Sequence, residues 1–334
     1  MIHDFGSVTL KSGETVEVGC VQGPELAWAE RIEKLLGHKG DVWRAQNSEI
    51  LRNDVGIEAY FYILHRDGVP FSNIMTVEVN GVGILGHVWT DPEDRRKNAT
   101  TLLMERQMAH FRERGGKALF LGTGFDSPPY HIYERFGFRG IEDHSGSMDY
   151  YASSKSIFEG WYFAPGPAEL EPLSWKHWPA SPALFLGAFP GVVRSAPMKL
   201  IGRRSTEGRL LPLLRELADG KPARAVALRS RETTAVLGMA VWDWDPLWRD
   251  ACLVDVYCHP DHWSRADELL AALELPQAAR YVAYTDPECA MKCELFRRAG
   301  FRSVVTLPQW TPGDSANTHR VDVTLLEKAG AVTT

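Results

Sequence analysis

Hydrophobic and polar residues follow two patterns along this chain, a strict alternation in some stretches and a helical periodicity in others. Alternation indicates half-buried strands, and helical periodicity indicates amphipathic helices. In the first half the patterns predict, in order, a strand at 15–21, a helix at 25–36, strands at 58–66, 74–79 and 83–90, a helix that ends at Gly115 and Gly116, a strand at 117–122, a short helix at 128–135 and a last strand opened by Gly137. Because strands and helices are mixed throughout, the pattern indicates an α/β (α+β) fold.

The second half repeats this order of elements. It predicts strands at 223–228, 235–243 and 251–258, a helix at 266–273, a strand at 281–285 and a short helix at 292–298. The ends of the two short helices resemble each other, with Tyr-Glu-Arg-Phe-Gly-Phe-Arg at 133–139 and Phe-Arg-Arg-Ala-Gly-Phe-Arg at 296–302. The stretch 153–172 is rich in Ser, Gly and Pro and is predicted to be a connector. We therefore expect two domains, 1–155 and 156–334, each with a mixed central sheet flanked by helices.

Size and composition fit two globular domains and narrow the function. The chain has 334 residues, 44% hydrophobic and 24% charged, which is ordinary for packed domains. A net charge of −6 argues against a general nucleic-acid binder. The first residues lack the features of a signal peptide, and no apolar run is long enough to cross a membrane. The five cysteines form no CxxC pair, so we expect a cytoplasmic protein with reduced thiols and no metal.

The most specific chemical signal is the segment 90–103. It follows the apolar run 82–89 and leads into an amphipathic helix, so it forms a turn between a strand and a helix N-terminus. Such a turn directs several backbone N–H groups toward one point, at the positive end of the helix dipole. Arg95, Arg96 and Lys97 add three positive charges there. The segment therefore predicts a pyrophosphate-binding site.

This turn resembles the acyl-CoA-binding loop of the GNAT acyltransferases, whose pattern is Arg/Gln-x-x-Gly-x-Gly/Ala. Arg95 takes the first position, whereas Asn98 and Thr100 stand where glycines are usual. Asn tolerates left-handed backbone better than most residues, and a Thr hydroxyl can donate to a phosphate. The resemblance covers most of the chain and implies two tandem GNAT-type domains, with acetyl-CoA as co-substrate.

The resemblance also implies roles for individual residues in the first domain. Backbone groups at the end of the strand would hold the pantetheine arm and the thioester carbonyl, and those of the turn would hold the pyrophosphate. The cofactor-binding residues implied in this way are Val88, Trp89, Thr90, Arg95, Arg96, Lys97, Asn98, Ala99, Thr100 and Thr101.

Two catalytic residues are implied as well. Tyr133 matches the tyrosine that many members use as the general acid toward the departing thiolate, and Tyr130 is the alternative donor. His87 stands where many members carry an acidic base; Glu78 and water are the alternatives. Asp126, with Ser127, is expected to cap the helix at 128–135 rather than to act in catalysis.

The second domain differs at these positions. With the two turns aligned, Asp267 and Glu268 stand at the positions of Ala99 and Thr100, and Phe296 replaces Tyr133. Two carboxylates in a pyrophosphate turn repel the ligand by about 1 kcal/mol or more each. We expect that the second domain does not use acyl-CoA and instead packs on the first domain, walling off the acceptor pocket.

These observations predict an N-acetyltransferase that transfers an acetyl group directly to a primary amine of a small-molecule acceptor. An acyl-cysteine route is disfavoured because no cysteine lies near the turn. The alternatives are a non-catalytic acyl-CoA-binding or sensor protein and a sequestration protein that needs no cofactor. No nucleic-acid or membrane partner is expected, and the oligomeric state stays open.

Overall fold

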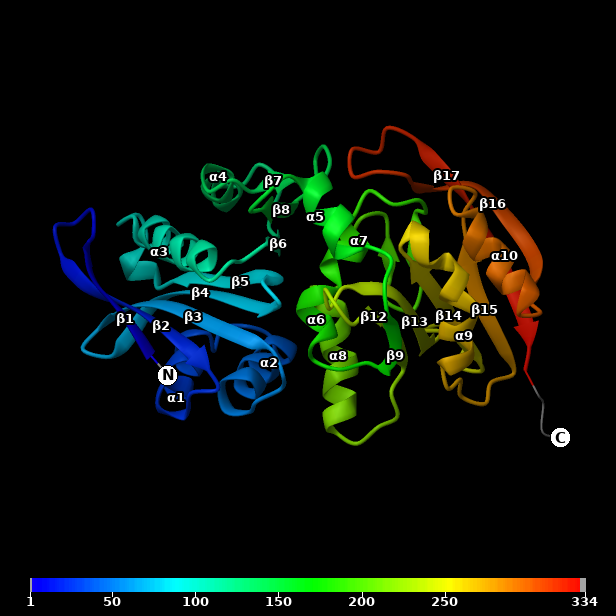
Figure 1. The fold of residues 1–334 in the computed structure, drawn as a ribbon, viewed down its shortest axis with the longest axis horizontal. Helices are drawn as coiled ribbons and strands as arrows, with labels where there is room; N and C mark the ends of the chain where they lie inside the picture. Colours follow the sequence, from blue (N-terminus) through cyan, green and yellow to red (C-terminus); the bar gives the residue numbers. More distant parts are fainter. Residues whose placement is uncertain (1, 331–334) are drawn as a thin grey trace. The chain divides into compact units, whose positions relative to one another are not determined.

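The computed structural model describes residues 2–330 and divides into two compact units, each with its own large sheet (Figure 1). Unit 1 comprises the chain up to Arg139 and the segment Met148–Phe158, and unit 2 comprises Gly140–Ser147 and the chain from Glu159 on. Helices and strands are mixed in both units, which confirms the predicted α/β class. The predicted domain limits, 1–155 and 156–334, stay a prediction; the compact units divide the chain close to them, within the helix α5 (Lys155–Tyr162).

The sheet of unit 1 has eight strands in the order β1-β2-β3-β4-β5-β6-β8-β7. Neighbours from β1 to β5 are antiparallel, and β5 pairs with β6 in parallel. The strands are β1 (Ile2–Thr9), β2 (Thr15–Gly23), β3 (Glu58–Arg66), β4 (Val69–Val79), β5 (Val82–Thr90), β6 (Ala118–Gly122), β7 (Arg139–Gly140) and β8 (Ser147–Tyr151).

The helices of unit 1 cover both faces of its sheet. In Figure 1, α1 (Leu26–Leu35) and α2 (Asp41–Arg52) lie on one face, and α3 (Ala99–Glu113) and α4 (Pro128–Arg135) lie on the other. The side of α3 toward the sheet buries Leu103, Met104, Met108 and Phe111 completely. Burying each of these side chains contributes about 1.5–3 kcal/mol, and this packing fixes the direction in which the N-terminus of α3 points.

Unit 2 has a seven-stranded sheet in the order β16-β17-β15-β14-β13-β12-β9 and a separate two-stranded sheet of β10 and β11. Its strands are β9 (Ala168–Pro172), β10 (Val193–Ser195), β11 (Leu200–Ile201), β12 (Ala225–Ser230), β13 (Val236–Trp244), β14 (Ala251–Cys258), β15 (Arg280–Thr285), β16 (Arg302–Pro312) and β17 (Arg320–Ala329). Its helices are α6 (His177–Ala180), α7 (Pro182–Leu186), α8 (Glu207–Ala218), α9 (Ala266–Ala272) and α10 (Ala290–Arg298).

In both sheets the two parallel neighbouring strands separate after the same number of residue pairs. The parallel pair β5 and β6 holds register only from Val82 to Ile84, and the parallel pair β14 and β15 only from Ala251 to Leu253. Beyond these three residue pairs the strands are no longer hydrogen-bonded to each other. In each unit the backbone of the longer strand is therefore released from its parallel neighbour before the following turn.

The predicted elements agree with the structure to within a few residues, and 58–66, 128–135 and 251–258 match as predicted. The prediction of a connector at 153–172 was wrong, because this stretch contains α5 and β9. The Ser154 hydroxyl accepts a hydrogen bond from the backbone N–H of Ile157, and Phe158 and Tyr162 are buried. The Ser, Gly and Pro residues of this stretch thus lie within and around a packed helix rather than in a linker.

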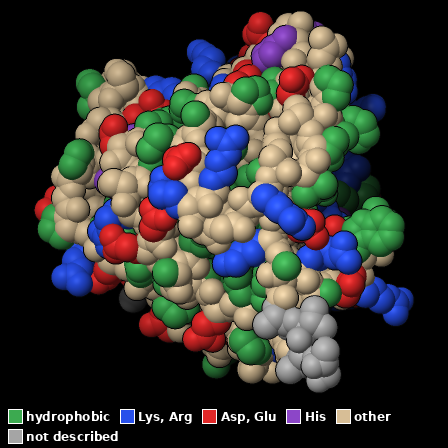
Figure 2. All heavy atoms as spheres, turned by 90° about the vertical axis from the view of Figure 1, so that its right-hand side faces the viewer, with side chains coloured by type: hydrophobic (Ala, Val, Ile, Leu, Met, Phe, Trp, Pro, Cys, Tyr) green, Lys and Arg blue, Asp and Glu red, His purple; other side chains and the backbone are tan. Residues whose placement is uncertain are grey.

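Within residues 2–330, no helix is both long enough and apolar enough to cross a membrane. The same part of the chain contains no group of three or more His, Cys, Asp or Glu side chains arranged to hold a metal ion, and its five cysteines are free thiols. Figure 2 shows one face of the molecule, where positive, negative and hydrophobic side chains are interspersed.

Candidate active site

A β-bulge interrupts β5 just after it leaves β6. In the ladder with β4, Met75 pairs with Gly86 but Asn73 pairs with Trp89, so two residues of β5, His87 and Val88, lie opposite one residue of β4. His87 adopts a left-handed backbone with φ 49°, and the Asn73 amide donates to its carbonyl oxygen at 2.9 Å. A bulge takes backbone groups out of the ladder and redirects them. The bulge therefore frees the backbone around Val88 in the segment where a thioester is expected.

The turn after β5 contains a left-handed position, Asn98, that the sequence pattern anticipates. Asn98 has φ 68° and is the N-cap residue of α3, with no capping hydrogen bond from its side chain. It stands at the first of the two usual glycine positions and takes the backbone conformation for which glycine is favoured. Thr100 lies inside the first turn of α3 and has no positive φ. Of the two departures from the pattern, only the one at residue 98 involves a special backbone conformation, and Asn can adopt it.

The N-terminus of α3 offers three backbone donors. The first intrahelical bond of α3 runs from Leu102 N–H to Asn98 O, at 3.1 Å. Helix geometry leaves the N–H groups of Ala99, Thr100 and Thr101 without an intrahelical acceptor, at the positive end of the dipole. Together these groups form an anion-binding site of the kind that binds phosphates.

The three cations of the turn have different surroundings. Lys97 binds Asp94 at 2.8 Å, and Asp94 also accepts two hydrogen bonds from Arg66. The hydrogen bonds from Arg66 are the largest cause that lowers the pKa of Asp94. Arg95 donates to the carbonyl oxygen of Thr90 at 3.1 Å, and its guanidinium lies 4.6 Å from the centroid of a neighbouring indole ring. Lys97 and Arg95 therefore hold the turn in shape.

Arg96 is the cation of this turn that remains available to a ligand. Its backbone is left-handed, with φ 63°, and it is exposed. Its side chain forms no hydrogen bond or ion pair with any residue of 2–330. We therefore expect Arg96, rather than its neighbours, to provide the strongest side-chain contact to a pyrophosphate.

A chain of hydroxyl groups joins the end of β5 to the first turn of α3. The Thr90 hydroxyl lies 2.8 Å from that of Ser72 and 3.2 Å from that of Thr100. Thr90 itself is buried. The Thr100 hydroxyl, predicted to donate to a phosphate, thus has a partner within the protein and helps to fix the end of the strand against the helix.

Tyr133 lies on α4 and is 6% exposed. Its ring packs against Phe138, with centroids 6.1 Å apart, in the hydrophobic cluster that also contains Ala99 and Leu103 of α3 and that Val88 packs against. Tyr133 thus lies in the same core cluster as the first residue of α3 and the side chain of Val88.

The cap of α4 differs from the sequence prediction. The Ser127 hydroxyl, and not Asp126, accepts the N-terminal hydrogen bond, from Tyr130 N–H at 3.4 Å. Asp126 has φ 56°, and its carboxylate lies 3.0 Å from His131 Nε2. Its left-handed backbone turns the chain before the helix, and the next residue then takes the extended conformation of an N-cap.

His87 contacts the other face of the sheet. Its Nε2 lies 2.6 Å from the amide oxygen of Gln46 on α2, and its ring packs edge-on against Trp43. Burial lowers the pKa of His87 to about 3. An amide oxygen accepts hydrogen bonds, so Nε2 carries the proton in a neutral imidazole. So weak a base is a poor acceptor for the proton of an alkylamine. The contacts with α2 favour a positioning role, in which His87 holds the bulge against this helix.

A pH profile tests this role of His87. Because its imidazole stays neutral, kcat/KM should show no inflection near the ordinary histidine value of about 6.5, and its acid limb should follow the pKa of the acceptor amine when acceptors are exchanged. His87→Gln should lower activity and leave the shape of the profile unchanged. An acid limb near 6.5 that is independent of the acceptor and lost in His87→Gln would show that His87 is the base.

Glu78 lies at the other end of the β4–β5 ladder. It is paired with Gly83, which is four residues before His87 and therefore roughly 14 Å from it along the strand, at ~3.4 Å per residue. Its carboxylate is fully buried and accepts two hydrogen bonds from Arg114, at 2.9 and 3.1 Å. Burial raises its pKa, and Arg114 acts in the opposite direction. Glu78 therefore belongs to a structural ion pair with Arg114.

Unit 2 lacks the geometry of this site. The ladder of β13 and β14 runs without a shift from Gly238↔Cys258 to Trp244↔Cys252, so β14 has no bulge. The turn after β14 is the 3-10 helix η2 (Pro260–Arg265), which continues directly into α9 and contains no residue with positive φ. Asp267 and Glu268 lie in the first turn of α9.

A segment of the chain, residues 192–196, binds to side chains on and near β14 and β15, in the region of unit 2 where these strands have separated. The carboxylate of Asp286, just after β15, accepts hydrogen bonds from the N–H groups of Val192 and Val193, at 3.0 and 2.8 Å. Lys292 on α10 donates to the carbonyl oxygen of Val193 at 2.7 Å. Asp255 on β14 accepts from the N–H of Ala196 at 2.8 Å and forms an ion pair with Lys292. These side chains are buried, and they bind the protein's own backbone as other sites bind a ligand.

Nothing in the sequence predicted that Asp255, Lys292 and Asp286 lie around the same segment of backbone. A lysine on an amphipathic helix normally reaches solvent, and nothing local to Lys292 indicates that it is fully buried. The contact with β10 joins residues about a hundred positions apart, beyond the reach of any local pattern.

Comparison with known proteins finds a similarity to acetyltransferases in unit 1. A family model described as the acetyltransferase (GNAT) domain matches residues 73–141, which contain the bulge, the turn, α3 and α4. No curated protein matches this sequence.

Among solved structures, an N-acetyltransferase from Staphylococcus aureus Mu50 is 14% identical, with a TM-score of 0.37, covering 49% of this chain and 99% of its own. The ribosomal-protein-S18-alanine N-acetyltransferase from Escherichia coli is 13% identical, with a TM-score of 0.33, covering 50% of this chain and 97% of its own. A ribosomal-protein-alanine N-acetyltransferase from Brucella melitensis is 19% identical, with a TM-score of 0.37, covering 48% and 99%. Within residues 73–141 the match to the GNAT acetyltransferase domain agrees with the resemblance found in the sequence.

Proposed function

We propose that unit 1 transfers the acetyl group of acetyl-CoA to a primary amine of a small-molecule acceptor, and that unit 2 does not use the cofactor. The observation that carries this proposal is the continuous path from the bulge at His87, through the left-handed Asn98, to the free N–H groups of α3. Released strand backbone and an anion site follow each other within one segment, as a thioester joined to a pyrophosphate requires. The family match over the same residues supports acyl transfer.

The donor set fits the cofactor without a metal ion. Backbone N–H groups of Ala99, Thr100 and Thr101, with the Arg96 guanidinium, would hold the pyrophosphate. Backbone groups of Val88, Trp89 and Thr90 would hold the pantetheine arm. Bound acetyl-CoA supplies an activated thioester. Arg95, Lys97 and Asn98 shape the turn that presents these groups.

The reaction then needs few protein groups. The acceptor nitrogen, neutral and with a free electron pair, attacks the thioester carbonyl, a C–N bond forms and the C–S bond breaks. Tyr133 gives its phenolic proton to the departing thiolate, and the amine proton leaves to water. Tyr133 on α4 belongs to the hydrophobic cluster that Val88 of β5 packs against, whereas His87 of β5 is held by Gln46 on α2.

The cofactor part of the proposal predicts different effects for two arginines in equivalent turns. Arg96→Glu replaces the one available cation of the turn by an anion, and we expect a loss of acetyl-CoA affinity of about 100-fold, because each charge-assisted hydrogen bond contributes about 1.5–3 kcal/mol. Arg265 instead pairs with Glu268 in unit 2, so Arg265→Glu should leave the affinity within about twofold. Calorimetric titration with acetyl-CoA measures both, and equal losses would overturn the claim of one cofactor-binding unit.

An amine panel separates this proposal from the alternative of a non-catalytic acyl-CoA-binding or sensor protein. Purified protein is mixed with acetyl-CoA and each of a series of amino sugars, amino acid derivatives, polyamines and antibiotic amines, and free thiol is followed. Release of thiol that depends on an amine supports the enzyme. Binding of one equivalent of acetyl-CoA with no turnover on any amine supports the sensor, and the absence of binding would refute both.

A further inference from the structure

Unit 2 carries a hollow whose charged lining residues are all positive. The hollow has a volume of about 400 Å³ and is lined by Lys199, Leu200, Ile201, Arg204, Ser205 and Arg209. Lys199 lies between β10 and β11, Arg204 follows β11, and Arg209 lies in the first turn of α8. Three segments of the chain therefore contribute one cation each to the same concave surface.

None of these three side chains forms a hydrogen bond or an ion pair with a residue of the described part of the chain, 2–330. Nearby arginines behave differently: Arg203 donates to the carbonyl oxygens of Leu186 and Ile141, and Arg224 pairs with Glu216. In a protein of net charge −6, three unpaired cations around one hollow repel one another. An anion bound between them would remove this repulsion.

Hydrogen bonds to buried residues hold in place the backbone that carries the three cations. Lys199 has a left-handed backbone, with φ 56°, and its N–H donates to Ala196 O at 3.0 Å. Ala196 N–H is in turn bound by the buried Asp255 at 2.8 Å. At the start of α8, the Thr206 hydroxyl lies 2.6 Å from that of Ser181. The three cations thus project from a fixed scaffold, which lowers the entropy lost on binding a ligand.

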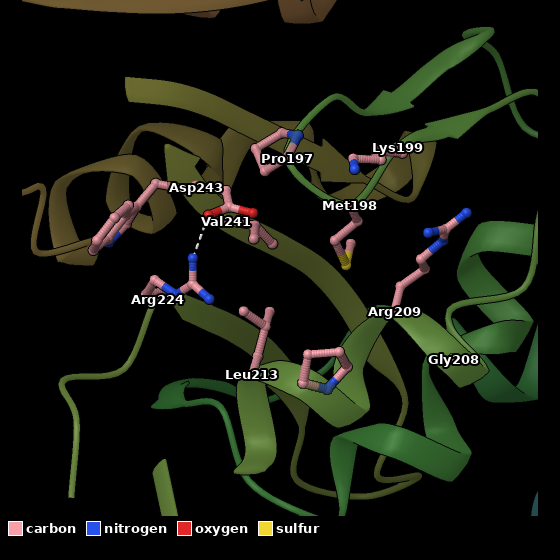
Figure 3. Close-up of a pocket in the computed structure, with 11 residues that line it drawn as sticks. Pro197, Met198, Lys199, Gly208, Arg209, Leu213, Arg224, Val241 and Asp243 are labelled. Carbon is pink, nitrogen blue, oxygen red and sulfur yellow. Dashed lines mark hydrogen bonds and ion pairs between the residues drawn. The ribbon is translucent and has the colours of Figure 1, made fainter. Parts of the chain in front are cut away.

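A second hollow adjoins the first and shares Lys199 and Arg209 with it (Figure 3). It has a volume of about 170 Å³, and its remaining lining residues are Pro197, Met198, Gly208, Pro212, Leu213, Arg224, Val241, Trp242 and Asp243. Met198, Leu213 and Val241 surround the space in Figure 3, and the ion pair of Arg224 and Asp243 borders it. The second hollow therefore combines an apolar part, formed by Met198, Leu213 and Val241, with charged residues at its edges.

We propose that the two hollows form one binding site for a small organic phosphate, with the phosphate between Lys199, Arg204 and Arg209 and an apolar group against Met198 and Leu213. A phosphate monoester carries about two negative charges at neutral pH, which matches three cations better than the single charge of a carboxylate. Arginine guanidinium groups also bind phosphate oxygens in pairs of hydrogen bonds. The site is independent of the acetyl-transfer site in unit 1.

Calorimetric titration of the full chain with phenyl phosphate tests the proposal. We expect one equivalent to bind, with an affinity that falls as ionic strength rises. The double variant Lys199→Glu/Arg209→Glu should bind at least about tenfold more weakly. Arg249→Glu/Arg297→Glu is the matched control, because it changes the charge equally at exposed residues of unit 2 outside the hollows and should leave binding unchanged.

Phenol and benzoate test which chemical group the site recognises, and competition with acetyl-CoA tests which unit binds the phosphate. Phenol should not bind, and benzoate should bind more weakly than phenyl phosphate. No binding of phenyl phosphate, equal binding of benzoate, or full binding by Lys199→Glu/Arg209→Glu would each overturn the proposal. Competition between acetyl-CoA and phenyl phosphate that is unchanged in Lys199→Glu/Arg209→Glu would place the phosphate at the N-terminus of α3 in unit 1 and overturn the proposal. Competition that is lost in this variant would contradict a cofactor-free unit 2.

Discussion

Replacing Tyr133 by Phe is expected to lower kcat by about 10²- to 10⁴-fold, the usual contribution of a positioned general acid. The phenol, with a pKa of about 10, is matched to a departing thiolate whose conjugate acid has a pKa of about 8.5. Phe keeps the ring that packs against Phe138 and loses only the hydroxyl. The affinity for acetyl-CoA should therefore be retained, since the pyrophosphate site at the start of α3 is unchanged. Thiol release on the acceptor found in the amine panel gives kcat, and calorimetry gives the affinity.

Tyr130→Phe provides the matched control for this prediction. Tyr130 lies one turn earlier on the same helix and is buried to a similar extent, 7% against 6% exposed. A loss confined to Tyr133→Phe identifies the acid. A loss confined to Tyr130→Phe would assign the role to Tyr130, and an unchanged kcat in both variants would mean that the thiolate leaves without a protein acid.

The sequence was sufficient for most elements of the two sheets because each element carries its own pattern. The strand Glu58–Arg66 is bounded by a turn, and α3 buries an apolar face with helical spacing. The helix α2 went unpredicted because its sequence is mainly polar, and its burial depends on contacts with the sheet. In 153–172 the composition misled, since Ser154 starts a helix whose apolar side chains are buried by residues far away in the sequence.

At the candidate site, the sequence indicated the chemistry of the turn but not the shape of the strand. Asn98 was expected to tolerate left-handed backbone, and it has φ 68°. The bulge at His87 could not be anticipated, because it depends on how β5 aligns with β4 and on the amide of Asn73. The same contacts bury His87, which is why a residue suggested as a base turns out to be so weakly basic.

The two units follow one plan and differ in structure at the place where the cofactor site is proposed in unit 1. Both separate their parallel strands after three residue pairs. Unit 1 combines this separation with a bulge and a left-handed turn. Unit 2 instead has a regular strand and three buried side chains that bind the backbone of residues 192–196, in and beside β10. Substituting the turn of unit 2 alone should therefore not create a cofactor site, because the backbone of Val193 already uses the donors and acceptors there.

Lys292→Met is expected to destabilise unit 2 by about 3–5 kcal/mol, the usual result of removing one partner of a buried ion pair. Lys292 is fully buried and binds both Asp255 and the carbonyl oxygen of Val193. Met has a similar length and leaves Asp255 as a buried carboxylate with no cation beside it. Chemical denaturation of the full chain, followed by the tryptophans of unit 2, measures the free energy of unfolding. A loss below about 1 kcal/mol would contradict the role of this ion pair.

The pH dependence and a double variant separate the lost charge from a general packing defect. Burial raises the pKa of Asp255 to about 6 even beside Lys292, and without the cation it should rise further. An acid whose pKa is higher in the folded than in the unfolded state gains stability as the pH falls through that range. The variant starts to gain at a higher pH than the native chain, so the penalty of Lys292→Met should shrink as the pH falls toward about 6 and stay constant below it. Asp255→Asn added to Lys292→Met should restore part of the stability at pH 7, because the buried charge is gone and the side chain can still bind Ala196 N–H through its amide oxygen. A penalty independent of both pH and Asp255 would show that Lys292 acts only by filling space.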